Sequence, residues 1–222
     1  MCIRDRGYTG LSIWNYMSEF KSYLLNVPAA LFAIYFPRAV IRGPFPETLA
    51  KWDELLATRR VPIIGTSDAH GVHYKWGPLR GIIFPYDYTF RAVNLHILSE
   101  QPFCGDWRQD KEIVYGAMKG GHAFVAYDLI GDARGFRFTA SDGEKEVSMG
   151  QELLLRNAAT LEVASPRPAD LRLMRQGRVV ARRWGTTLRY IARERDAYRV
   201  EARRYTLFRL RGWVFTNPIY LV

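Results

Sequence analysis

The fold expected for this chain depends on the stretch Val61-Pro62-Ile63-Ile64-Gly65-Thr66-Ser67-Asp68-Ala69-His70-Gly71. Its first five residues form a continuous apolar run, which is typical of a parallel strand covered on both faces. Another buried strand is expected at residues 10–15, and between the two strands residues 47–56 show the apolar spacing of a helix. Strand, helix and strand in this order favour an α/β barrel or a doubly wound sheet.

The pattern changes further along the chain. A helix is compatible with residues 16–35 and ends before Pro37, strands are expected at residues 92–99 and 122–127, and a helix is expected at 106–119. Later residues predict short strands separated by turn signals at intervals of about 8 to 12 residues, which is typical of a β-sandwich. These strands are expected at residues 135–140, 144–149, 160–164, 171–175, 178–184, 187–193 and 198–206. The pattern predicts an α/β domain at 1–125 and a β-sandwich domain at 126–222.

Composition limits the classes of protein to consider. The chain has 222 residues, of which 48% are hydrophobic and 24% charged, so disordered, collagenous and disulfide-scaffold proteins are excluded. The best membrane-span candidate, residues 24–36, is too short, and no membrane span is expected. The two cysteines, Cys2 and Cys104, give no disulfide framework, and Cys104 has no cationic neighbour in sequence that favours a nucleophile.

The net charge of +10 belongs to one segment. Residues 151–222 contain 15 arginines, no lysine and six acidic residues, which leaves a net charge of +1 for residues 1–150. The arginines recur within the segments predicted to be strands, as expected for the solvated face of a half-buried sheet. No basic block with interleaved aromatic residues is present, so a solvated face is favoured over a nucleic-acid surface, and no nucleic-acid partner is expected.

Asp68 and His70 are the candidate metal ligands. In an extended backbone, residues two apart point the same way, so the carboxylate and the imidazole are expected to face one cavity. An oxygen and a nitrogen donor in this arrangement suit Zn²⁺, Mn²⁺ or Fe²⁺. Asp-x-His also arises by chance, and Asp68 can instead cap the following turn. From the residues alone, metal binding and capping are equally supported.

Several stretches together resemble one family. Residues 63–71 are similar to the last metal-ligand motif of the polymerase and histidinol phosphatase (PHP) metallohydrolases, and Gly10-Leu11-Ser12-Ile13-Trp14-Asn15-Tyr16 resembles a strand of that family, with Ser12 where glutamate is usual. Four further stretches resemble its CehA/McbA-like branch, whose named member hydrolyses carbaryl. They are Trp52-Asp53-Glu54-Leu55-Leu56, Phe124-Val125-Ala126-Tyr127-Asp128, Tyr198-Arg199-Val200-Glu201-Ala202 and Trp213-Val214-Phe215-Thr216-Asn217-Pro218-Ile219-Tyr220.

The resemblance implies the C-terminal part of a distorted (β/α)7 PHP barrel in residues 1–125, followed by the β-sandwich. It also implies two or three divalent metals (Zn, Mn or Fe), with Asp68 on one and His70 on another. The expected activity is hydrolysis of a small-molecule phosphoester, carboxyl ester or carbamate by metal-activated water. The family's opening His-x-His and its middle ligands are not found among the four histidines of this chain. The catalytic residues therefore stay unknown.

The first residues favour a truncated chain. Met1-Cys2-Ile3-Arg4-Asp5-Arg6 has neither the apolar region nor the cleavage site of a secretory signal, and a buried strand follows almost at once. We expect an N-terminally truncated fragment with an incomplete metal site. A cytoplasmic and an exported location are both compatible with the sequence, as is any oligomeric state.

The remaining candidates have less support. His73 can orient a ligand or lie in a solvated loop, and Arg80 can hold a substrate anion or be a surface charge. Asn15 can hydrogen-bond the site or close a turn, and the turn is favoured. His96 is expected as a satisfied strand histidine, and His122 as a packing or turn residue. The alternative to the hydrolase is a non-catalytic scaffold whose β-sandwich binds a partner protein or a glycan.

Overall fold

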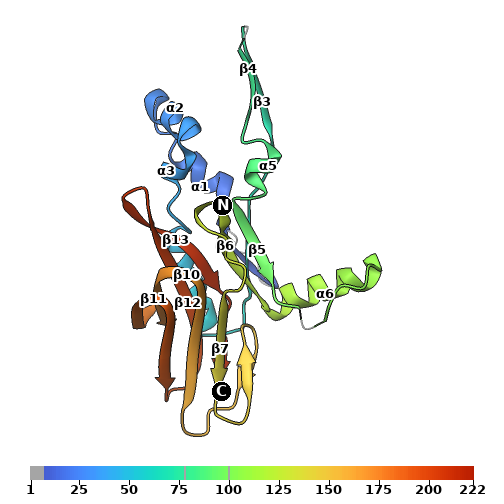
Figure 1. The fold of residues 1–222 in the computed structure, drawn as a ribbon, viewed down its shortest axis with the longest axis vertical. Helices are drawn as coiled ribbons and strands as arrows, with labels where there is room; N and C mark the ends of the chain where they lie inside the picture. The colour runs from blue at the N-terminus through green and yellow to red at the C-terminus, as the bar shows by residue number, and fades with distance from the viewer. Residues whose placement is uncertain (1–7, 78, 100) are drawn as a thin grey trace.

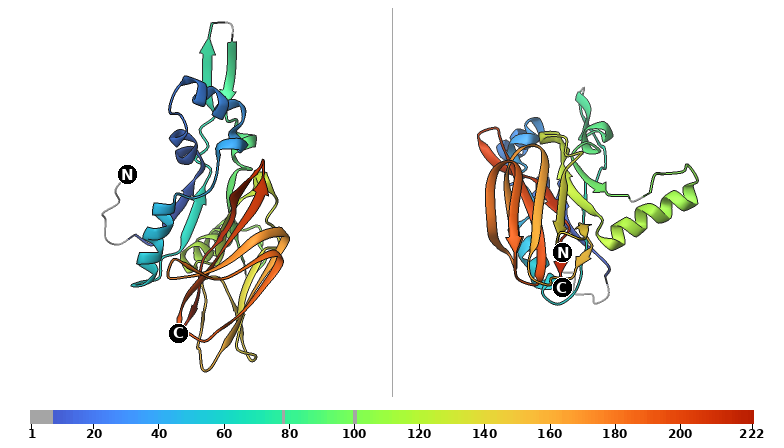
Figure 2. Two further views of the ribbon diagram at one scale, coloured as in Figure 1. Left: turned by 90° about the vertical axis from the view of Figure 1, so that its left-hand side faces the viewer. Right: turned by 60° about the horizontal axis from the view of Figure 1, so that its bottom comes forward.

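The computed structural model describes residues 8–77, 79–99 and 101–222, and the interpretation of residues 1–6 and of Cys2 falls outside these residues. Strands make up 43% of the chain and helices 25%. A large curled sheet dominates the molecule, and the N-terminal elements, in blue and cyan, lie along one side of it (Figures 1 and 2).

A parallel strand pair is formed by the stretches expected to be buried strands. Strand β1 (Leu11–Asn15) pairs with β2 (Ile63–Thr66), and helix α4 (Pro46–Leu56) lies between them in the chain. The indole Nε1 of Trp52 in α4 donates a hydrogen bond of 2.9 Å to the carbonyl of Val61, just before β2. The strand–helix–strand order expected from the sequence is confirmed for these three elements.

The large sheet contains ten strands, all from residues 93–221. They are β5 (Val93–Ile97), β6 (Ala123–Tyr127), β7 (Arg137–Ser141), β8 (Glu146–Ser148), β9 (Glu152–Leu153), β10 (Ala159–Arg175), β11 (Arg178–Ala192), β12 (Asp196–Thr206), β13 (Arg209–Thr216) and β14 (Ile219–Leu221). The main order is β5-β6-β13-β12-β10-β7-β8, with β11 on β10 and β14 between β12 and β9. The pairs are antiparallel except β9–β14. The sheet thus continues across residue 125, the expected domain division.

Strand β10 bends at Pro166 and Pro168. Before the prolines it pairs with β7, after them with β12, and its register with β11 shifts between Ala164 and Ala169. Proline has no amide hydrogen to donate to a ladder, so the chain bulges there and resumes pairing. The strands expected separately at 160–164 and 171–175 are therefore one bent strand, and those at 178–184 and 187–193 are likewise one strand, β11.

The fold class expected from the sequence is wrong. Only one parallel pair of strands precedes the antiparallel sheet, and the described residues contain six α-helices, so the chain is not part of a (β/α)7 barrel. The C-terminal residues form one curled sheet, a half-barrel, in place of a separate β-sandwich. The local pattern at β1, α4 and β2 predicted an α/β barrel or a doubly wound sheet, and the resemblance implied the (β/α)7 barrel. Apart from β9–β14, the following strands pair antiparallel, which a local pattern does not specify.

Five further α-helices lie in the described residues. They are α1 (Tyr16–Ser22), α2 (Val27–Tyr35), α3 (Pro37–Val40), α5 (Tyr86–Thr89) and α6 (Trp107–Gly120), with a 3-10 turn η1 (Asp128–Ile130). The helix expected at 16–35 is divided because the Asn26 side chain caps α2 by accepting from the amide of Ala29, and Pro28 follows in its first turn. Within the described residues, no helix combines the length and apolar character that a bilayer crossing requires.

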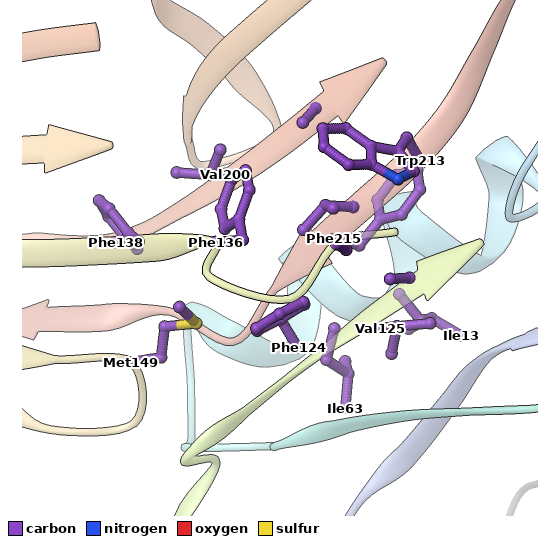
Figure 3. Packing of buried hydrophobic residues seen from close by; sticks show 14 of the residues in the cluster. Ile13, Ile63, Phe124, Val125, Phe136, Phe138, Met149, Val200, Trp213 and Phe215 are labelled. Carbon is purple, nitrogen blue, oxygen red and sulfur yellow. The ribbon is translucent and has the colours of Figure 1, made fainter. Parts of the chain in front are cut away.

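The core lies between the sheet and the N-terminal elements. Figure 3 shows Ile13 and Ile63 of the parallel pair close to Val125 of β6, and Phe136 near Trp213 of β13. The contact is tight at Gly65, where an added Cβ would lie 2.3 Å from a methyl carbon of Val125. A larger residue at position 65 would therefore push β2 away from the sheet.

Candidate functional site

Asn217 joins the parallel pair to the large sheet. Its side-chain oxygen accepts from the amide of Ile63 at 2.8 Å, and its Nδ2 donates to the carbonyls of Ile63 (3.3 Å) and Ala123 (2.9 Å). Asn217 is fully buried. Because Ile63 begins β2 and Ala123 begins β6, this bridge aligns the amino ends of the two strands.

The carboxyl ends of β1, β2 and β6 consequently lie at the same end of the molecule. The rings of Trp14 in β1 and Tyr127 in β6 are 5.7 Å apart, and the ring of Tyr16, just after β1, is 6.0 Å from that of Tyr127. Residues that follow β2, including Asp68 and His70, leave the strand at this end. Carboxyl ends of parallel strands are a frequent location of active sites in folds with parallel strands.

Asp68 and His70 lie together beyond the end of β2. The His70 Nδ1 is 3.7 Å from the Asp68 Oδ1, and it donates to the Asp68 carbonyl oxygen at 2.6 Å. The strand ends at Thr66, and Asp68 has a φ of 51°, so a loop and not an extended strand brings the two side chains together. Both are solvent-accessible, with 35% of the Asp68 side chain and 57% of the His70 side chain exposed.

The loop around His70 is held by helix α5. The Tyr86 hydroxyl donates to the carbonyl of His70 at 3.2 Å, and the Tyr86 ring packs against Gly71, whose φ is 55°. Because the His70 Nδ1 donates within the loop, Nε2 remains the atom available to a ligand. In the described parts of the chain, no group of three or more His, Cys, Asp or Glu side chains is arranged to hold a metal ion.

The other predicted site residues lie on other elements. His73 and Arg80 are on the hairpin of β3 (Val72–Trp76) and β4 (Leu79–Ile83), which projects from the molecule (Figure 1). They occupy the same face as Lys75 and Ile82. Asn15 caps α1, its side-chain oxygen accepting from the amide of Ser18 at 2.8 Å, which is the turn-closing alternative.

The hydrogen-bond partner of His96 was not predicted from the sequence. His96 in β5 donates to the Asp128 Oδ2 at 2.9 Å, and Asn94 donates to the same oxygen at 2.9 Å. The His96 ring also stacks on Phe124 at 4.7 Å. His96 is thus the satisfied strand histidine that the sequence predicts, but its partner lies 32 residues away and no local pattern identifies it. His122 similarly donates from Nδ1 to the carbonyl of Met149.

The buried Tyr16 and Tyr127 and the partly buried Tyr88 lie next to the strand ends. The hydroxyls of Tyr16 and Tyr88 are 3.0 Å apart, and Tyr16 contacts the ring of Tyr127. Burial raises the pKa of Tyr16 and of Tyr127 well above the usual value, and Tyr88 adds to the rise at both. These phenols therefore stay protonated at neutral pH and do not act as bases.

Buried Glu19 has a structural role, because its carboxylate accepts four hydrogen bonds. It accepts from the Trp14 Nε1 at 2.7 Å, the Tyr23 hydroxyl at 3.1 Å, and the amides of Arg42 (2.5 Å) and Gly43 (3.1 Å). Burial raises the pKa of this carboxyl, although these hydrogen bonds oppose the rise. With its oxygens occupied in this way, Glu19 is not a candidate metal ligand.

Residues 52–56 and 198–202 meet in an ion-pair cluster. Arg199 in β12 donates to both carboxylate oxygens of Asp53 in α4, at 2.8 and 2.7 Å, and to Glu201 at 2.8 Å. Its guanidinium also lies 4.9 Å from the centre of the Trp52 ring. Arg203 completes the cluster by donating to the other oxygen of Glu201. These residues connect α4 to the sheet, a structural role for both stretches.

Hollows in the surface lie away from Asp68 and His70. One of about 950 Å³ borders α4 and β12 beside the Arg199 cluster, and another of about 780 Å³ lies near Lys119, His122 and Tyr220. Neither is lined by Asp68 or His70. Comparison of the chain with known protein families, curated proteins and solved structures found no match.

Proposed function

We propose that Asp68 and His70 bind a divalent metal ion in a hydrolase of phosphoesters, carboxyl esters or carbamates. The supporting observation is their separation of 3.7 Å at the accessible carboxyl end of β2, with the His70 Nε2 available. The resemblance to the PHP metallohydrolases supplies the reaction class. A carboxylate oxygen and an imidazole nitrogen form a donor set that fits Zn²⁺, Mn²⁺ or Fe²⁺.

The chain itself binds the metal ion and orients the His70 imidazole. The metal, when bound, supplies a water molecule of lowered pKa and polarises the oxygen under attack. The Asp68 carbonyl and the Tyr86 hydroxyl fix the loop, so the imidazole keeps one orientation. Catalytic zinc sites usually have three protein ligands, so with two the chain is expected to bind metal weakly.

Zinc titration followed by NMR of the four histidine side chains tests the ligand assignment. Zn²⁺ is expected to shift the ring signals of His70 and to leave those of His96 and His122 in place. Asp68→Asn is expected to weaken the response, whereas Asp87→Asn, an exposed aspartate in α5, serves as the matched control. A His70 ring unchanged by excess Zn²⁺, or an equal response in wild type and Asp68→Asn, would refute the assignment.

Hydrolysis assays test the activity. With two ligands, the chain is expected to hydrolyse p-nitrophenyl phosphate and naphthyl carbamates no faster than a metal blank. Turnover that requires added metal and disappears in Asp68→Asn would show that two ligands are sufficient. Metal-dependent turnover that persists in Asp68→Asn would place the activity elsewhere.

The second candidate function is a non-catalytic scaffold whose sheet binds a protein or a glycan. It is favoured by the lack of a third metal ligand near Asp68 and His70 among the residues described. The hollow beside β12 offers a site lined by Arg60, Arg172 and Arg195 together with Asp196 and Glu54. Glycan binding that Arg195→Ala weakens, together with no response of His70 to zinc, would favour this function.

A further inference from the structure

Helix α2 and the turns beside it expose an apolar patch. Seven large side chains within 13 residues are accessible to solvent: Leu24, Leu25, Val27, Leu31, Phe32, Tyr35 and Phe36. Leu25 is 83% exposed and Val27 73%. In α2 itself only Ala33 is fully buried. A helix that is apolar on nearly all sides is normally covered, so its exposure indicates an interaction surface.

The segment of chain that carries the patch is basic. No Asp or Glu occurs between Glu19 and Glu47, whereas Lys21, Arg38 and Arg42 lie in that interval, all exposed. A partner that combines apolar groups with negative charge therefore fits this surface.

A second exposed apolar point lies beside the patch, at the turn between β12 and β13. Phe208 is 90% exposed and Leu207 51%, and Arg209 follows them. Their φ angles are 61° and 48°, in the left-handed region where bulky side chains are unfavourable and Asn or Gly is usual. The backbone at Phe208 is strained while its aromatic ring is exposed to solvent, which indicates that the ring has a functional role.

The turn and the patch are connected. Arg211 in β13 donates to the carbonyl of Ala39 at 2.8 Å, and the amide of Gly212 donates to the carbonyl of Arg42 at 2.7 Å. Figures 1 and 2 show the tip of this hairpin and helices α2 and α3 on the same side of the molecule. The two exposed apolar regions therefore belong to one face.

We propose that this face binds the surface of an anionic phospholipid bilayer. Leu25, Phe32 and Phe208 would enter the boundary between headgroups and acyl chains, and Arg38, Arg42 and Arg209 would contact the lipid phosphates. The helix lies at the interface and does not cross it. The proposal is independent of the proposed hydrolase function, since neither Asp68 nor His70 takes part.

Vesicle flotation tests the proposal. The chain is expected to float with phosphatidylcholine vesicles containing about 30 mol% phosphatidylglycerol, and much less with pure phosphatidylcholine. Raising NaCl from about 0.1 to about 0.5 M should weaken binding by screening the basic residues. Leu25→Ser and Phe208→Ser should each lower the partition coefficient about tenfold, since each removes one buried apolar side chain.

Matched controls separate this surface from general attraction by a basic protein. Leu154 is an exposed leucine and Arg156 an exposed arginine next to the C-terminal residue, at the opposite end of the molecule. Leu154→Ser and Arg156→Glu should leave binding almost unchanged, whereas Arg209→Glu should weaken it about fivefold. All of these positions are exposed, so the variants are expected to fold.

Three results would overturn the proposal. The first is no flotation with anionic vesicles. The second is an equal loss in Leu25→Ser and Leu154→Ser, or in Arg209→Glu and Arg156→Glu, which would mean non-specific attraction. The third is a dimer in light scattering that Leu25→Ser or Phe208→Ser dissociates while vesicle binding is unaffected, which would mean that a second copy covers the face.

Discussion

Asp170 is the buried carboxylate with the clearest ion pairs. It lies in β10 with its side chain 3% exposed, and it accepts from Arg172 at 2.7 Å and from Arg182 in β11 at 2.6 Å. Burial alone would raise the pKa of Asp170, but hydrogen bonds from Arg182 and Arg172 outweigh it and hold the pKa below the usual value. The ionised carboxylate therefore stabilises the folded state.

Replacing Asp170 should reveal this contribution. Asp170→Asn is expected to lower the free energy of unfolding by about 3 kcal/mol at neutral pH, because two arginines lose their partner. Since the pKa is lowered on folding, the stabilisation is present above the ordinary pKa and is lost as pH falls from that value towards the lowered one. Urea unfolding at several pH values measures both effects. A variant as stable as the wild type at pH 7 would contradict the assignment.

At the scale of single residues, the candidate site was partly predictable. Proximity of Asp68 and His70 was expected from their spacing, yet the expected extended backbone is replaced by a left-handed residue at Asp68. Pairing of His96 with Asp128, and of Arg199 with Asp53, depends on residues 32 and 146 positions apart. A single sequence contains no local signal for such pairs.

Helix α4 and strand β12 are joined by the bidentate contact of Arg199 with Asp53. Asp53→Ala and Arg199→Ala should each destabilise the fold by about 3 kcal/mol, because each removes an ion-pair partner from a largely buried charge. A double-mutant cycle should give a coupling energy of about 2 kcal/mol. Hydrogen exchange in α4 should accelerate in both variants. Additive effects of the two substitutions would contradict the contact.

The Asn217 bridge gives a test of how β2 is attached to β6. Asn217→Asp keeps the size of the side chain, but an ionised carboxylate does not donate to the carbonyls of Ile63 and Ala123. The variant is expected to lose about 3 kcal/mol at pH 7, because two buried carbonyls each lose a side-chain donor and a charge is buried.

Acidification should partly restore the Asn217→Asp variant. Burial raises the pKa of an unpaired carboxyl, and its protonated form regains one donor, so the destabilisation should shrink as pH falls. Thermal unfolding of wild type and variant across pH 4 to 8, about the range in which such a group titrates, measures the difference. A destabilisation independent of pH would show that the lost donor, and not the charge, is the main cost.

At the scale of elements, local signals succeeded where they were complete. The predicted helices at 47–56 and 106–119 and the strand at 122–127 are confirmed. Apolar spacing defines the first helix, and the Asp106 cap and the Gly120-Gly121 stop define the second. The bent strand β10 was missed because Pro166 and Pro168 indicated an end, whereas tertiary pairing with β11 continues past them. Strand order, and with it the barrel prediction, failed because pairing partners are non-local.

For the whole molecule, the sheet predicts cooperative unfolding. Strand β5 pairs with β6, and β6 pairs with β13. Residues on both sides of position 125 therefore share one hydrogen-bonded sheet. Trp14 and Trp52 report on the N-terminal elements and Trp213 on the sheet, and all three are buried. Unfolding followed by tryptophan fluorescence and by far-UV circular dichroism is expected to coincide. Two separate transitions would instead support domains at 1–125 and 126–222.

The proline bulge in β10 also affects how the length of this chain can vary among related sequences. An insertion within a regular stretch of β10 would turn every later side chain to the opposite face and expose residues such as Leu171 and Leu173, which are now buried. Residues 165–168 already lie outside the ladder with β11, so an extra residue there changes neither register. Insertions and deletions in this strand are therefore expected to accumulate between Ala164 and Ala169.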